Sequence, residues 1–451
     1  MRIFITLILF WFGLSSCNLK EPEFKKSDFL KLSQENKKAV GIKLNGNAQK
    51  IRKIGLGGSS LQAAIEKDPE ILAYEYDVLN SVQDARLILD SRSLQTSFKV
   101  NGGSLSLRDQ ENGVYGEVTG RKVLYDGDLA QQNVNSAEIS TELAYLRYST
   151  LIDTRVVELL GMYSNYRAQK ELYELTAIKL LNAKTLLRNL IKLNDVGQVD
   201  ATQLNDAQDK IDKFDADSRA SKSEYESTIR LIEDKFGVDI NKIFIKLPSV
   251  EDHNLQEIID SYPINNEQKI ALIDQKLSES RLVAHEKSRW GTLSAVSKID
   301  VPMKNSSIAP DASIGIVFER VLGDGGVFER EKDKLKISVL RASEYFENVT
   351  QNKLKSNEKL VSKIEMLSTQ LDDYKKLRKA AEEKVSYLED QISVGISDFN
   401  ALLSAHLNLF EYEKNIINYQ SELSIAFFQF LLNNSYLNSL IDYNYPLAYR
   451  F

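Results

Sequence analysis

One nine-residue pattern, V-G-x-x-D-x-x-x-L, occurs twice in the chain, at 196–204 and again at 394–402. Both copies lie between long stretches whose apolar residues recur with the period of an α-helix. Other landmarks recur at the same offset of 197 or 198 residues: V-L-Y-D-G-D at 123–128 against V-L-G-D-G-G at 321–326, D-P-E-I-L at 68–72 against N-E-Q-K-I at 266–270, and Arg92 against Arg289. A period this long is not that of a solenoid, so we predict an internal duplication of one larger assembly.

Repeat one, residues 61–237, is predicted to be a helix, a β-hairpin and a long helical hairpin. The hairpin at 92–123 is predicted from period-two alternation, with one face formed by Leu94, Thr96, Phe98 and Val100 and the other by Gln95, Ser97 and Lys99. A helix follows from about 129 to 193, and the chain turns near Gly197. Asp200 or Thr202 can cap the returning helix, which Gly237 ends.

Repeat two, residues 264–436, is predicted to have the same order, with a hairpin at 290–321 and a tip near Gly395. Its strand faces are predicted to hold Leu293, Ala295, Ile299 and Val301, and Ile314, Ile316 and Phe318. Its long helix, about 328–392, has a stripe at the spacing of a coiled-coil seam: Ile364, Leu367, Leu371, Tyr374, Ala381, Val385, Leu388 and Ile392. The predicted fold class is therefore mainly α with a small β part, with a connector at 238–263 and a tail at 437–451.

The first residues predict export. Arg2 precedes an apolar run from Ile3 to Leu14, which is too short to span a bilayer and is typical of a cleaved signal. Leu14-Ser15-Ser16-Cys17 resembles a bacterial lipobox, and Cys17 is the single cysteine of the chain. We therefore predict a signal peptide at 1–16, lipidation at Cys17 and a linker at 17–60; the alternative is a plain signal peptide with an incidental cysteine.

The four predicted strands are about ten residues long, which suits a tilted bilayer crossing. Lipid tolerates no open sheet edge, and the smallest bacterial barrels have about eight strands. Three copies of this chain would supply twelve. The strands carry charges that could face a water-filled lumen or bulk solvent, so two soluble hairpins remain the alternative: Lys99, Glu117, Arg121, Lys298 and Asp300.

Net charge, histidine spacing and the absence of motifs argue against several functions. A net charge of -6 disfavours nucleic acid as the main partner. The chain has three histidines, and none lies near a second ligand at metal spacing. G-D-G-G at 323–326 lacks the Lys-Ser/Thr of a phosphate-binding loop. We expect no enzyme activity, no cofactor and no metal.

These features together resemble the TolC family of outer-membrane efflux proteins. The resemblance rests on the lipobox, A-I-E-K-D-P-E-I-L at 64–72, L-Y-D-G-D at 124–128 and both V-G-x-x-D-x-x-x-L patterns, and it covers about residues 60 to 436. It implies a homotrimer with a shared twelve-stranded β-barrel in the outer membrane and an α-helical barrel in the periplasm. The function it implies is a passive exit duct of a tripartite efflux pump or type I secretion system.

The resemblance also implies partners and contact residues. A periplasmic adaptor would dock at the tips and connect them to an inner-membrane RND or ABC transporter. By position, the implied contacts are Val196, Gly197 and Val199 in repeat one, and Val394, Gly395 and Ile396 in repeat two. The alternative role of both glycines is to permit the turn alone.

The family's acidic ring after the second tip has no counterpart, because Ala401 and Ser404 occupy those positions. Constriction charge would come instead from Asp206 and Asp209 of repeat one. Two other classes of protein remain open: a periplasmic adaptor lipoprotein, which would carry one hairpin set rather than two, and a structural coiled-coil envelope lipoprotein, which would leave the strands unexplained.

Overall fold

The computed structural model describes residues 65, 68–104, 112–197, 199–242, 245, 247, 249–261, 264–302, 311–393 and 399–437. The chain divides into two units, one of Met1–Ile51 with Tyr443–Phe451 and the other of Arg52–Asp442. All described residues belong to the second unit. Cys17 and the second tip, including Val394, Gly395 and Ile396, lie outside the described residues.

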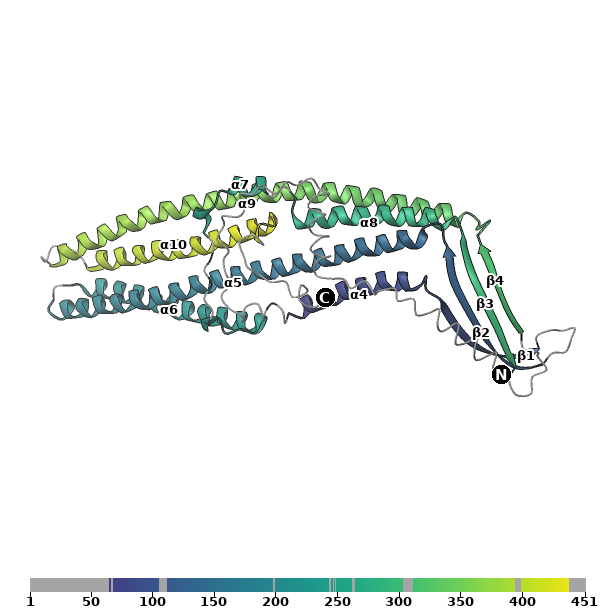
Figure 1. The fold of residues 1–451 in the computed structure, drawn as a ribbon. Coiled ribbons are helices and arrows are strands. Elements are labelled where there is room, and N and C mark those ends of the chain that lie inside the picture. Colours follow the sequence, from purple (N-terminus) through teal and green to yellow (C-terminus); the bar gives the residue numbers. More distant parts are fainter. Residues whose placement is uncertain are drawn as a thin grey trace. The chain divides into compact units, whose positions relative to one another are not determined.

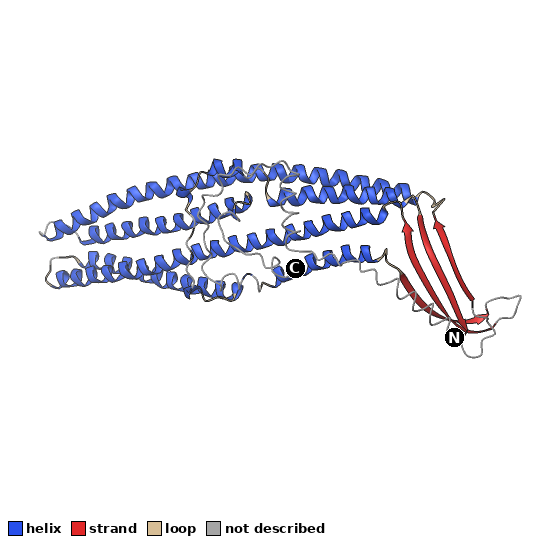
Figure 2. Ribbon diagram, in the orientation of Figure 1, coloured by secondary structure: helices blue, strands red, loops and turns tan. Residues whose placement is uncertain are grey.

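The two repeats have the same order of elements: a helix, two strands, a long helix and a shorter helix (Figures 1 and 2). Repeat one comprises α4 (Pro69–Asp90), β1 (Gln95–Ser104), β2 (Asn112–Tyr125), α5 (Leu129–Asp195) and α6 (Ala201–Phe236). Repeat two comprises α8 (Asn266–Ser288), β3 (Thr292–Pro302), β4 (Asp311–Glu319), α9 (Val327–Ser393) and α10 (Phe399–Asn433). The predicted duplication and fold class are confirmed.

The turn before each long helix repeats in atomic detail. Asp126 Oδ2 accepts a hydrogen bond from the Ala130 amide at 2.8 Å, and Asp324 Oδ2 accepts one from the Phe328 amide at 2.6 Å. The residue after each aspartate is a glycine with positive φ, 67° at Gly127 and 65° at Gly325. The aspartate caps the first turn of the helix while the glycine permits the left-handed step into it. The two D-G motifs are thus one structural device used twice.

The helices form a single layer that is four helices wide along its whole length. Near the sheet the contacts run α4 to α5, α5 to α8 and α8 to α9; nearer the tips they run α6 to α5, α5 to α10 and α10 to α9. The long helices α5 and α9 therefore extend through both halves, while α4 and α6 follow one another along one side. One free side of the layer is α9, and the other is α4 with α6.

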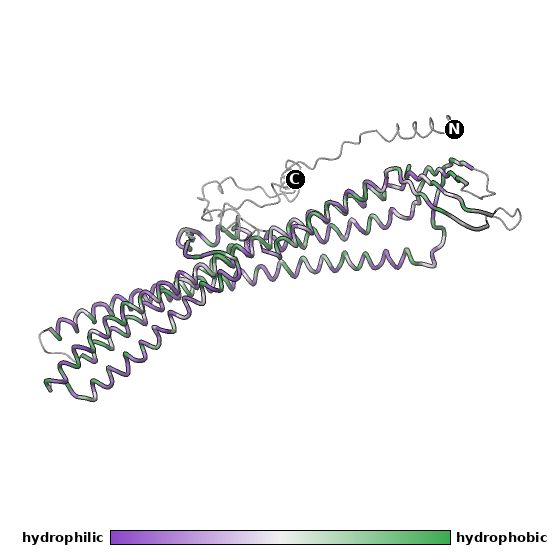
Figure 3. The backbone as a smooth tube through the Cα atoms, turned by 90° about the horizontal axis from the view of Figure 1, so that it is seen from below, coloured by the Kyte–Doolittle hydropathy of each residue, from purple (hydrophilic) through white to green (hydrophobic). Residues whose placement is uncertain are grey.

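Apolar stripes hold this layer together, and hydrophobic and hydrophilic residues alternate along each helix (Figure 3). Five members of the predicted α9 seam are buried: Ile364, Leu367, Leu371, Val385 and Leu388. Near the first tip, residues of α5, α6 and α10 form a common cluster in which Phe214 meets Phe410 edge to face at 4.7 Å between ring centroids. The predicted seam is confirmed.

Short connections join all four strands to helices at the same end of the unit. Only residues 126–128 separate β2 from α5, and only 289–291 separate α8 from β3. The 67-residue α5 extends about 100 Å from there, at about 1.5 Å per residue. The sheet and the first tip therefore lie at opposite ends of the helices (Figure 1).

The connector between the repeats holds structure that the sequence did not predict. It contains two 3-10 turns, Ile240–Lys242 and Val250–Asp252, and a short helix, α7 (Leu255–Ser261). The strands also differ by a few residues from the predicted hairpins at 92–123 and 290–321. The division into repeats, connector and tail otherwise stays a prediction.

Candidate functional site

The sheet has the order β1-β2-β3-β4 with every neighbouring pair antiparallel. Its register places all the charges that the sequence left unassigned on one face. Lys99, Glu117 and Asp300 are cross-strand partners in one row. Arg121 and Lys298 lie on the same face, because residues two apart on a strand point the same way.

Ion pairs and hydrogen bonds connect this charged face. Lys298 Nζ lies 3.4 Å from Glu117 and 3.0 Å from Asp300. Arg121 donates a hydrogen bond of 2.6 Å to Glu319 on β4. Ser97 and Thr119 share a hydrogen bond of 2.6 Å between β1 and β2. A face with so many paired charges suits contact with water.

The opposite face is largely apolar and uncovered. One row across it holds Phe98, Val118, Ile299 and Ala312, and further rows hold Val100, Val301, Leu293, Ile314, Ile316 and Phe318. Ile314 is 81 % exposed and Phe318 is 60 % exposed. Lys122 is the charged exception, and it lies near the helices, where a long side chain can reach water. The predicted strand faces are confirmed, except that Leu94 precedes β1.

The sheet has two open edges. Both β1 and β4 have one partner strand each, and all nine residues of β4 are exposed. An open edge leaves backbone N–H and C=O groups unpaired, which hydrocarbon does not tolerate. In a bilayer, a sheet with one apolar face, one charged face and two free edges would need further strands to complete it.

The first tip is compact and has one protruding apolar side chain. Gly197 has a φ of 74°, and a Cβ added there would meet nothing within 4 Å. Val196 is 68 % exposed, whereas Val199 packs partly against the cluster of α5, α6 and α10. The Asn194 side chain donates to the Val199 carbonyl at 2.9 Å and closes the turn. Of the three residues predicted to contact an adaptor here, Val196 is therefore the most available side chain.

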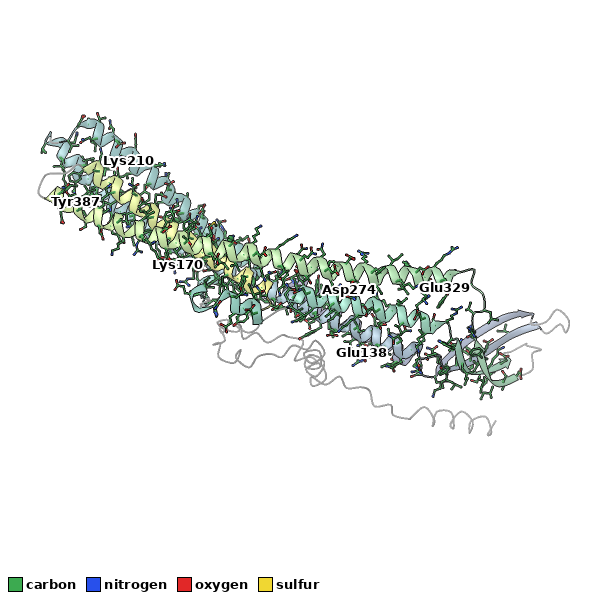
Figure 4. The ribbon with its side chains drawn as sticks, turned by 90° about the horizontal axis from the view of Figure 1, so that it is seen from above. Glu138, Lys170, Lys210, Asp274, Glu329 and Tyr387 are labelled. Carbon is green, nitrogen blue, oxygen red and sulfur yellow. The ribbon has the colours of Figure 1, made fainter. Side chains whose placement is uncertain are left out.

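The two predicted constriction charges differ in their surroundings. Asp206 forms an ion pair of 2.6 Å with Lys210, whose ammonium also lies 3.3 Å from the Ser404 hydroxyl on α10. Asp209 is exposed one turn along α6. Lys210 is labelled near the tip end in Figure 4, with Glu329 near the sheet end. Because Lys210 partly neutralises Asp206, Asp209 is the stronger candidate for a constriction charge.

Midway along the helices, the two repeats differ in their polar contacts. In repeat one, Arg155 pairs with Asp68 at 3.0 Å, with Glu158 at 2.9 Å and with Glu70, and Lys235 pairs with Glu158. This network joins the start of α4 and the end of α6 to α5. Although partial burial raises the pKa of Glu158, hydrogen bonds from Lys235 and Arg155 lower it below its usual range.

The equivalent junction of repeat two contains neutral amides and one buried amine. Lys353 stands 198 residues after Arg155 and is 6 % exposed. Beside it on α9, Asn357 exchanges hydrogen bonds of 3.0 Å with Asn434, which follows α10. Asn265 caps α8 and donates to the Asn433 carbonyl at 2.9 Å. One junction thus depends on charge and the other on amide hydrogen bonds.

The lowered pKa of Lys353 should make the stability of the protein depend on pH. Burial, with repulsion from Lys269, lowers the pKa of Lys353 to about 8 from its usual 10.5. Between these values the unfolded chain binds a proton that the folded chain does not, so the contribution of Lys353 to the unfolding free energy rises with pH. We expect Lys353→Met to remove up to about 3 kcal/mol of this rise, measured by denaturant unfolding from pH 7 to 10.5. An unchanged difference between variant and wild type over this range would contradict the prediction.

Among the described helices, none is long and apolar enough to cross a membrane. Within the described residues, no group of histidine, cysteine or acidic side chains is arranged to hold a metal ion. Two histidines are engaged in packing: His253 stacks on Phe427 and His285 on Phe328. The notable features of the described residues are therefore the two-faced sheet, its open edges and the first tip.

No protein-family model matches the sequence, and no curated protein matches it either. Several solved structures, however, are similar to this chain in fold. The outer membrane protein VceC from Vibrio cholerae is 13 % identical, with a TM-score of 0.70 over 84 % of this chain and 95 % of that one. A membrane protein from Pseudomonas aeruginosa gives 12 % identity and a TM-score of 0.73 over 89 % and 94 %. The CmeC outer membrane channel of Campylobacter jejuni is 11 % identical, with a TM-score of 0.69 over 83 % of this chain and 84 % of that one.

The architecture defines a class of protein in which helices about 100 Å long extend from a small antiparallel sheet. Over most of its length, the chain has the fold of the TolC-family outer-membrane channels. At 11 to 14 % identity, the agreement between these structures is one of architecture.

Proposed function

We propose that the chain is one protomer of a trimeric outer-membrane exit duct that serves a tripartite efflux pump or a type I secretion system. The observation that carries the proposal is the sheet, with one apolar face, one charged face and two unpaired edges. In a bilayer the apolar face meets lipid and the charged face lines water. Three copies supply twelve strands, which is enough to close a barrel.

The order of the helices supports the same ring. α4, α5, α8 and α9 follow one another across the layer in the order of the strands to which they connect, β1, β2, β3 and β4. A rotation that places β4 of one copy against β1 of the next therefore also places α9 against the next copy's α4 and α6. One heterologous contact, repeated three times, closes the sheet and the helical wall together.

The duct is passive, and its partners act at its ends. Lipidation at Cys17 would anchor each chain to the outer membrane, and the tips would reach into the periplasm. A periplasmic adaptor that docks there would connect the duct to an inner-membrane RND or ABC transporter. The helices open at the tips when the adaptor binds, and the transporter chooses the substrate.

Val196 provides a test of docking. Its exposed apolar side chain at the first tip offers an adaptor a small surface that excludes water. We expect Val196→Asp to lower adaptor-dependent export about tenfold, because it leaves a charge in an apolar contact. The measurement is export of a pump substrate from cells, together with cross-linking to the adaptor. Val196→Leu is the matched control and should keep both export and cross-linking at the wild-type level. Equal loss of export in the two variants would contradict the prediction.

Electron microscopy of the acylated protein in detergent tests the whole assembly. We expect a threefold tube of about 100 Å or more, with a detergent belt at one end. A monomeric rod without a detergent belt would contradict the proposed trimeric duct. It would favour a periplasmic adaptor or a structural envelope lipoprotein instead.

A further inference from the structure

A polar groove lies over α5, between α4 and α8, at the end of the helices nearest the sheet. Its volume is about 460 Å³, within the range of about 300–1,000 Å³ that is usual for small-molecule sites. Because α4 and α8 both pack against α5, they form the two walls and α5 forms the floor. None of the channel features described above uses this groove.

The walls of the groove carry opposite charges. Asp84 contributes a carboxylate from α4, and Arg281 contributes a guanidinium from α8. Asn133 and Ser140 of α5 add an amide and a hydroxyl to the floor. Within the described part of the chain, Asp84 and Arg281 form no ion pair or hydrogen bond with another residue. Charges so arranged suit a ligand with one cationic group and one anionic group.

The groove also changes in polarity along its length. Ile88 and Leu129 line it close to the strands, since α4 ends at Asp90 and α5 begins at Leu129. Arg281 lies seven residues before the end of α8, which is about 10 Å farther from the sheet. The two larger apolar side chains of the groove thus lie toward the sheet, beside His285 and Ser288 of α8, and the two charges lie away from it. An amphiphile would bind with its apolar end toward the membrane.

We infer that this groove binds the zwitterionic headgroup of a phospholipid of the phosphatidylethanolamine type. The ammonium group is held by Asp84, the phosphate by Arg281, and the start of the acyl region by Ile88 and Leu129. This inference rests on the proposed function, which places the sheet in the membrane, and it requires the groove to open on the outer wall.

Native mass spectrometry of the detergent-purified protein tests the inference. The protein is incubated with equal amounts of phosphatidylethanolamine and phosphatidylglycerol that carry the same acyl chains. Phosphatidylglycerol has the phosphate but lacks the ammonium group, so Asp84 disfavours it. We expect about tenfold preference for phosphatidylethanolamine, since one hydrogen bond to a charged group accounts for a ratio of this size.

Variants separate the two charges. Asp84→Asn should abolish the preference while phosphatidylglycerol still binds, and Arg281→Gln should weaken the binding of both lipids. Asp77→Asn on α4 and Lys276→Gln on α8 are matched controls, because both residues are exposed and lie outside the groove. They should keep the wild-type preference.

Three results would overturn the inference: equal binding of the two lipids by the wild type, an unchanged preference in Asp84→Asn, or full displacement of the lipid by an equal concentration of free phosphoethanolamine. The last would assign the groove to a soluble zwitterion. The same spectra report the oligomeric mass, which keeps the two proposals apart. A monomer contradicts the trimeric duct, whereas a trimer without lipid preference contradicts the lipid site alone.

Discussion

Replacing Ile314 with arginine is expected to abolish assembly of the protein in the outer membrane. Ile314 is 81 % exposed on the apolar face of β4, which the proposed barrel turns toward lipid. An arginine on the lipid face near the bilayer midplane costs about 2–4 kcal/mol. A trimer carries three copies, so the total is about 6–12 kcal/mol, comparable with the whole stability of a folded domain at about 5–15 kcal/mol.

The adjacent residue provides the control. Ser313 precedes Ile314 on the same strand and therefore points to the charged face, in the row of Lys298. Ser313→Arg adds the same side chain to the proposed water-filled lumen, so it should assemble at close to the wild-type level. The two variants differ in position by one residue and in nothing else that affects export or translation.

The measurement is the amount of trimer recovered from the outer-membrane fraction after density-gradient separation. Ile314→Arg should reduce it to near background, while Ser313→Arg should not. Equal recovery of both variants would mean that β4 does not face lipid. In that case the two soluble hairpins considered from the sequence would be the better interpretation of the sheet.

The alternation along the strands predicted both faces of the sheet but not their surroundings. Phe98 and Lys99 were predicted to point in opposite directions, and the structure confirms this. What the sequence could not provide was the register between strands that are far apart in the chain. Only the register brings Lys298 of β3 beside Glu117 of β2, and thereby gathers the scattered charges on one face.

At the tip, the sequence predicted the turn but not the direction of each side chain. Gly197 and the cap at Asp200 were evident, because a left-handed residue and an N-cap have local signatures. Val196 and Val199 look alike in sequence, yet one is exposed and the other packs on the helices. Their difference depends on the return of α6 against α5, which is a tertiary contact. The second tip stays a prediction.

The groove over α5 had no signal in the sequence. Asp84, Asn133 and Arg281 come from three helices, and each stands among polar residues at the spacing of a solvated helical face. The two junctions midway along the helices have no sequence signal for the same reason. The offset of 198 residues between Arg155 and Lys353 was available, but it has meaning only when both are seen at the same place in the two repeats.

The second large effect is expected at the edge of the helical layer. Leu340 is 66 % exposed on α9, and Tyr76 is 62 % exposed on α4 at the opposite edge. Leu340 lies 13 residues from the sheet end of α9, and Tyr76 lies 14 from that of α4, so they lie at the same height. In the proposed ring, the Leu340 side chain of each protomer faces Tyr76 of the next.

Leu340→Glu should therefore prevent the trimer while leaving the protomer folded. The charge is tolerated on an isolated chain, where the position faces water. In the ring it would be buried without a partner at three symmetry-related contacts, at about 3 kcal/mol each. Leu340→Met keeps the volume and apolar character of the side chain and should leave the trimer intact. The measurement is the mass of the detergent-solubilised protein, with helix content as the test of folding.

A cysteine pair tests the same contact without destabilising it. Cys17 is the single cysteine of the chain, and lipidation would consume its thiol, so Tyr76→Cys with Leu340→Cys introduces the reactive pair. Because the two positions lie on opposite edges of one layer, a disulfide between them can form only from one protomer to the next. We expect oxidation of the double variant to give a covalent trimer, which a reducing agent separates into single chains. Neither single variant should form a covalent trimer. If the double variant stayed monomeric under oxidation while Leu340→Glu remained trimeric, α9 would not meet α4, and the chains would have to associate through another surface.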